Sequence, residues 1–139
     1  MTAASEALAP TPTTSRTMVW VGRVLSGMSI AFFVLDAVMK FVNPPQVPET
    51  MRQLGWDPSL AVPLAVILLV CTAVYAIPRT AFLGAVLLTA YLGGAVATHV
   101  RVGSPLFTHV LFGVYVGMFV WGGLYLRDAR VRALFKATA

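Results

Sequence analysis

Residues 60–100 read LAVPLAVILLVCTAVYAIPRTAFLGAVLLTAYLGGAVATHV, two long apolar runs separated by a turn at IPRT. The runs, residues 60–77 and 81–100, each have about the 20 residues that a helix needs to cross the hydrocarbon core of a bilayer. Both are too long for ordinary strands. Pro78 lacks an amide donor and ends the first helix, so the sequence predicts a tight helical hairpin inside a membrane.

Two further apolar runs flank this hairpin, at residues 18–42 and 106–126. NPPQVP cannot continue a helix, and VRVGSP predicts a second hairpin. In GWDPS, Asp57 is expected to cap a new helix that has Pro58 at its first position. The sequence therefore predicts an all-α integral membrane protein, a bundle of four transmembrane helices with a short extracytoplasmic segment between the first two.

The composition agrees with a membrane protein and argues against a water-soluble one. Hydrophobic residues make up 58% of the 139 residues and charged residues only 11%, too few to cover a soluble domain of this size. We expect one domain, with a disordered cytoplasmic tail at 1–16, the membrane domain at 17–127 and a basic cytoplasmic tail at 128–139. The apolar run at 18–42 is too long for a signal peptide.

The basic residues predict the orientation. Four spans place both termini on one side, and seven of the ten lysines and arginines fall on or near that side: Arg16, Arg23, Arg79, Arg127, Arg130, Arg132 and Lys136. The other side has Lys40, Arg52 and Arg101. By the positive-inside rule, both termini are expected in the cytoplasm. The net charge of +5 is then a topology signal, and no nucleic-acid partner is expected.

Small and polar residues recur at helical spacing and predict the faces that meet in the bundle. In the first span the face holds Gly22, Ser26, Ser29, Phe33, Asp36 and Lys40; in the second, Ala61, Ala65, Leu68, Thr72 and Tyr75; in the third, Gly84, Leu87, Tyr91, Gly94, Thr98 and Arg101. The fourth span has two candidate faces, one with His109 and Gly113, the other with Thr108, Tyr115 and Gly122.

Asp36 is the least expected residue, because it lies roughly 9 Å below the end of its span, too deep to reach water. Lys40 follows at i+4 on the same face, the favourable order for an ion pair, and is close enough to the surface to extend outward. Arg101, His99 and His109 are expected in the same layer. The ionisable groups of the membrane domain therefore converge at its extracytoplasmic end.

Two interpretations of this layer stay open. Asp36, Lys40 and Arg101 could form a purely structural ion-pair clasp between the first and third spans. Alternatively, the layer belongs to a polar pocket for a small ligand, a quinone head group or a proton path. The candidate ligand-binding residues are Asp36, Lys40, Tyr91, Gly94, Thr98, His99, Arg101, His109 and Tyr115. No metal site is expected, since two histidines without a nearby cysteine or second carboxylate are too few ligands.

Three stretches, LDAVMKFVNPP, the segment from LGWDPS to HVRVG, and WGGLYLRD, resemble the bacterial DoxX-like membrane proteins of the DoxX/DoxD type. The resemblance covers about residues 20–130 and implies a four-span bundle in the inner membrane of a bacterium. Family positions matched here include Asp36, Lys40, Tyr91, Gly93, Gly94, His99 and Arg101, without catalytic roles attached to them. Broader relatives include a quinone-reducing subunit of thiosulfate oxidation, subunits implicated in redox-enzyme maturation and a receptor-assembly chaperone.

Two classes of function follow. The first is an accessory subunit of a membrane redox or oxidative-stress system, with quinone as the possible cofactor. The second is a non-catalytic scaffold or assembly factor that binds other membrane proteins or further copies of itself. A small carrier is a third idea that would require an oligomer, because four spans are few for alternating access. No autonomous catalytic activity is expected, since no nucleotide-binding, zinc-hydrolase or nucleophile-and-base pattern is present.

Overall fold

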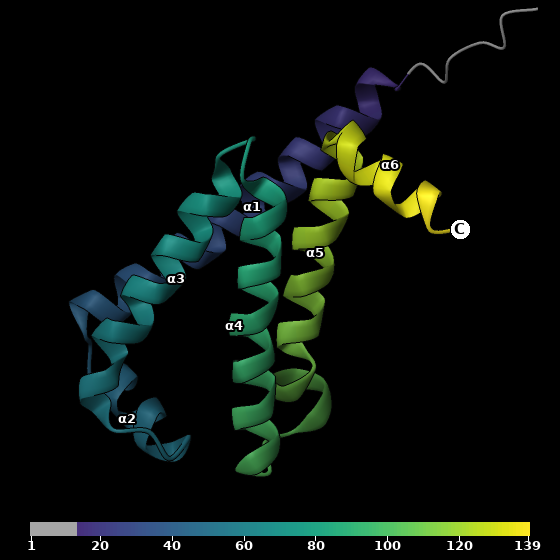
Figure 1. Cartoon of the computed structure of the whole chain (residues 1–139). Helices are drawn as coiled ribbons and strands as arrows, with labels where there is room; N and C mark the ends of the chain where they lie inside the picture. Colours follow the sequence, from purple (N-terminus) through teal and green to yellow (C-terminus); the bar gives the residue numbers. More distant parts are fainter. Residues whose placement is uncertain (1–13) are drawn as a thin grey trace, which may run out of the picture.

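The computed structural model describes residues 14–139 and is built around four long apolar helices (Figure 1). They are α1 (Arg16–Val42), α3 (Ala61–Ala76) with the short turn η1 (Pro58–Leu60) before it, α4 (Ala81–Arg101), and α5 (Phe112–Arg127) preceded by the π-helical turn η2 (Leu106–Val110). Each of the four is long and apolar enough to cross a membrane, and the described residues contain no strand. The predicted all-α, four-span fold is confirmed. The tail expected at 1–16 lies almost wholly outside the described residues.

The segment between the first two spans contains an extra helix, α2 (Gln46–Gln53), that we did not predict. Asn43 ends α1 in the left-handed conformation (φ 54°), and its N–H donates to the Met39 carbonyl at 3.0 Å. The cap at Asp57 forms as expected, because Oδ1 accepts the Ser59 N–H at 2.8 Å. Hydrogen bonds from the Ser59 side chain and from its N–H lower the pKa of Asp57.

The helices pack in a ring in which α1 and α4 lie on a diagonal. α1 packs against α3 and α5, and α4 packs against the same two helices. The shared core includes Phe33, Leu68, Tyr75, Leu88, Val120 and Leu124, all with at most 1% exposure. Tyr75 links three helices, because its hydroxyl donates to the Val120 carbonyl of α5 at 2.7 Å and lies 3.0 Å from Ser26 Oγ of α1.

Two glycine contacts set how the helices cross. A Cβ on Gly22 would lie 2.9 Å from the Gly123 carbonyl oxygen, so α1 and α5 touch backbone to backbone there. A Cβ on Gly84 would lie 2.2 Å from the Tyr75 nitrogen, so α3 and α4 meet equally closely just after their hairpin. From that contact the two helices separate along their length (Figure 1).

The predicted faces are correct for the second span and for most of the first. In α1, Gly22, Ser26, Ser29 and Phe33 are buried, and all five predicted residues of the second span are buried. The prediction for α4 is partly correct, because Gly84 is buried but Leu87 is exposed, and Leu88 and Leu92 are buried in its place. In the fourth span Gly113 is buried, whereas His109 is exposed and Tyr115 is 42% exposed.

Residues 128–139 contain a sixth α-helix, α6 (Ala129–Ala137), at the end of the bundle where α1 begins (Figure 1). Asp128 caps it, because its Oδ1 accepts the Arg130 N–H at 2.9 Å. The side chain of Arg130 also donates to this carboxylate and lowers the pKa of Asp128. We call this the α6 end of the bundle, and the opposite one the α2 end.

Candidate ligand pocket

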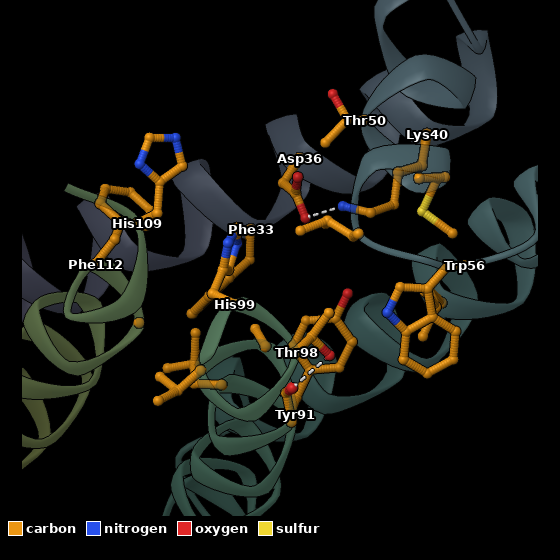
Figure 2. Close-up of a pocket in the computed structure, with 18 of the residues that line it drawn as sticks. Phe33, Asp36, Lys40, Thr50, Trp56, Tyr91, Thr98, His99, His109 and Phe112 are labelled. Atoms are coloured by element: carbon orange, nitrogen blue, oxygen red, sulfur yellow. Dashed lines mark hydrogen bonds and ion pairs between the residues drawn. The ribbon is translucent and has the colours of Figure 1, made fainter. Parts of the chain in front are cut away.

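A cavity of about 540 Å³ lies at the α2 end of the bundle (Figure 2). It forms where α3 and α4 have separated and where the diagonal pair α1 and α4 face each other across the bundle. Its walls come from α1, α2, α4, the η2 turn and the start of α5. Apolar and aromatic side chains make most of the lining, including Phe33, Met51, Trp56, Leu92 and Phe112.

An ion pair within α1 supplies the charged part of the pocket. The Lys40 ammonium donates to the Asp36 carboxylate, one helical turn away. The Lys40 side chain is 16% exposed and that of Asp36 is 39% exposed. Lys40 thus turns back toward the pocket, and the pair faces the cavity as a neutral, strongly dipolar unit (Figure 2).

The third predicted member of the clasp, Arg101, is elsewhere. Its guanidinium donates to the Leu54 carbonyl at 2.7 Å and lies against Gly55, so it holds the loop after α2. Arg101 is the last residue of α4, and at that position its side chain reaches the loop rather than the interior. A three-residue clasp with Asp36 and Lys40 is therefore wrong, and only the pair within α1 forms.

Hydroxyl and imidazole groups line the side opposite the ion pair. The Tyr91 hydroxyl points toward the Asp36–Lys40 pair (Figure 2) and makes no hydrogen bond within the described residues. Thr98 donates to the carbonyl of Gly94 at 2.9 Å. A Cβ on Gly94 would have no neighbour within 4 Å, so this glycine leaves open space in the pocket wall.

His99 and His109 meet at the rim, with ring centroids 5.7 Å apart. His99 Nδ1 shares a hydrogen bond of 3.0 Å with the Ser104 hydroxyl, and His109 Nδ1 one of 2.8 Å with the Thr108 hydroxyl. Each ring is thereby oriented, and its other nitrogen is left for a ligand or water. Residues 14–139 contain no group of three His, Cys, Asp or Glu side chains placed to hold a metal ion.

Comparison with known families supports the resemblance seen in the sequence. A model of the DoxX-like family matches residues 24–123, which run from α1 into α5 and include the residues that line the pocket. The protein belongs to the DoxX-like family. It is a small multi-pass membrane protein. Comparisons with curated proteins and with solved structures give no significant match.

Seven of the nine predicted ligand-binding residues line the pocket of this DoxX-like protein: Asp36, Lys40, Tyr91, Gly94, Thr98, His99 and His109. Arg101 and Tyr115 do not. Tyr115 lies two residues after Gly113 in α5, on nearly the opposite side of the helix, so only the candidate face with His109 and Gly113 reaches the pocket.

The α2 helix and the loop that follows it also contribute to the pocket, which we did not predict from the sequence. Val47, Thr50, Met51 and Trp56 all line the pocket. A signal for α2 was available, since Val47 and Met51 are apolar at i and i+4 in an otherwise polar segment.

Proposed function

We propose that this DoxX-like protein binds a small lipophilic ligand with a polar head, of the quinone class, as an accessory subunit of a membrane redox or oxidative-stress system. The observation that carries the proposal is the pocket, which combines apolar walls with an ion pair and a free tyrosine hydroxyl. Its volume of about 540 Å³ is in the range of small-molecule sites.

The proposed recognition follows from the chemistry of a quinone head group, a flat ring with two carbonyl acceptors. The Tyr91 hydroxyl and the Lys40 ammonium are donors for such carbonyls. Phe33, Trp56 and Phe112 supply aromatic surface for the ring. Asp36 accepts a hydrogen bond from Lys40 and orients it, so that the ammonium faces the cavity together with its counter-charge.

The ligand is identified by purifying the full chain in mild detergent and analysing the extracted lipids and quinones by mass spectrometry. A quinone at about one molecule per chain supports the proposal. The decisive variant is Gly94→Leu, whose side chain enters the pocket and is expected to abolish ligand retention while the helices still assemble.

Gly93→Leu is the matched control. Gly93 is the neighbouring residue of α4, also has open space beside it, and does not line the pocket. It should retain the ligand. If Gly94→Leu binds as well as wild type, or if Gly93→Leu loses the ligand equally, the pocket is not the binding site.

A scaffold or assembly factor is the second candidate. It is favoured by Gly27, Gly93 and Gly122, where an added Cβ would meet nothing within 4 Å, so that a helix of another protein could approach closely. Under this function the purified chain carries no quinone. Gly27→Leu would then remove a co-purifying membrane protein without changing the stability of the bundle.

The proposed location is the bacterial inner membrane, with both termini in the cytoplasm and the pocket at the periplasmic side. The distribution of Lys and Arg supports this orientation. Reporters fused after Ala139 and inserted at Gln46 should read cytoplasm and periplasm respectively. An exported C-terminal reporter would reverse the orientation.

A further inference from the structure

A second cavity, of about 270 Å³, lies at the α6 end, on the opposite side of the membrane from the ligand pocket. It is formed by α1, the turn between α3 and α4, and the junction of α5 with α6. The lining residues are Arg23, Pro78, Ala81, Arg127, Asp128, Ala129 and Arg130. Three arginines against one aspartate leave an excess of two positive charges around a small space.

Backbone contacts bring these arginines together. Arg23 follows Gly22, whose close contact with α5 places its Cα beside the Arg127 nitrogen, where an added Cβ would be only 2.7 Å away. Arg130 reaches the same place from α6 by donating to the Pro78 carbonyl at 2.8 Å. Hydrogen bonds to backbone carbonyls therefore fix Arg127 and Arg130 beside this space, whereas the side chain of Arg23 is exposed next to it.

Several N–H donors of these arginines have no hydrogen-bond partner within the described residues. Asp128 accepts from the Arg130 side chain and caps α6, so it is already paired. Arg127 stacks over the Tyr75 ring at 5.0 Å and donates to the Tyr75 carbonyl at 3.2 Å, but its buried Nε has no partner within the described residues. Arg23 has neither an ion pair nor a side-chain hydrogen bond within residues 14–139.

We propose that this cavity binds a phosphate monoanion, carried by the head group of an anionic phospholipid. Guanidinium groups match phosphate oxygens in charge and in the spacing of their donors. Arg127 is the last residue of the fourth span, which places the site at the depth of lipid head groups. Basic pockets between transmembrane helices have the chemistry that anionic lipid head groups require.

The test measures lipid retention by the full chain, purified in mild detergent, using native mass spectrometry. Phosphatidylglycerol is compared with phosphatidylcholine, in which choline offsets the phosphate charge. We expect preferential retention of phosphatidylglycerol, and Arg23→Gln should weaken it about five-fold, the effect of one basic side chain beside an anionic lipid. Arg79→Gln is the matched control, since Arg79 lies in the α3–α4 turn at the same end but does not line the cavity.

Competition with millimolar inorganic phosphate distinguishes the two sources of the anion. Phosphatidylglycerol that stays bound in the presence of phosphate supports a lipid site. If phosphate displaces phosphatidylglycerol completely, and if the chain retains both lipids equally when no phosphate is added, the site binds free phosphate and the lipid assignment is overturned. Equal losses in Arg23→Gln and Arg79→Gln would overturn the site itself. Arg127→Gln is informative only alongside its melting temperature, because that side chain also packs on Tyr75; Arg23→Gln avoids this difficulty.

Discussion

The Tyr75 hydroxyl is the most connected polar group in the core, and its removal gives a sharp test of the fold. Tyr75 is fully buried, and its single hydroxyl hydrogen goes to the Val120 carbonyl at 2.7 Å. Ser26 Oγ, 3.0 Å away, must then be the donor to the tyrosine oxygen. One atom thus connects α1, α3 and α5.

Tyr75→Phe removes both hydrogen bonds and keeps the ring on which Arg127 stacks. Side-chain hydrogen bonds inside membrane proteins contribute about 0.6 kcal/mol on average and at most about 1.7. The loss of two predicts a decrease of about 1 to 2 kcal/mol in the free energy of unfolding, toward the upper value because Ser26 is left without a partner on another helix.

Reversible unfolding in mixed detergent micelles, followed by circular dichroism, measures this change. Tyr115→Phe is the control, because Tyr115 is 42% exposed and its hydroxyl has no hydrogen bond within the described residues. If Tyr75→Phe is no less stable than Tyr115→Phe, the hydrogen bonds of the Tyr75 hydroxyl do not hold α1, α3 and α5 together.

Two further perturbations test the ion pair and the cap of α6. A double-mutant cycle of Asp36→Asn and Lys40→Met should give a coupling of about 1 to 2 kcal/mol in the free energy of unfolding. This value lies between those of exposed and buried ion pairs, because both side chains are partly exposed to the pocket. Independent effects of the two substitutions would refute the pairing. Asp128→Ala should destabilise the docking of α6 by about 0.5 to 2 kcal/mol, measured as faster amide exchange. Since the pKa of Asp128 is lowered in the folded state, its contribution is present above the ordinary carboxyl pKa and is lost as the pH falls through the lowered value. Asp128→Ala should remove this acid dependence, and an unchanged exchange profile would contradict the role of the cap.

Much of the candidate site could be predicted because its ionic part is local. Asp36 and Lys40 belong to one helix, and the i,i+4 relation alone places them side by side. Helical spacing also placed Tyr91, Gly94 and Thr98 on one face of α4. The role of Gly94 stayed open in the sequence, because a glycine in a membrane helix serves either close packing or open space, and only the neighbouring helices decide which.

The sequence by itself determined the four spans and their ends, because apolar length, prolines and caps act within a few residues of one another. The tertiary structure decided which residues meet from different helices. Arg101 contacts the loop after α2 rather than Asp36, α2 supplies a wall of the pocket, and Arg23 and Arg127 line one cavity at the opposite end. These outcomes depend on how the helices cross at the close contacts of Gly22 and Gly84. A small change in the crossing angle at such a contact moves the far end of the helix by a larger distance. No pattern within one segment of the sequence encodes that angle.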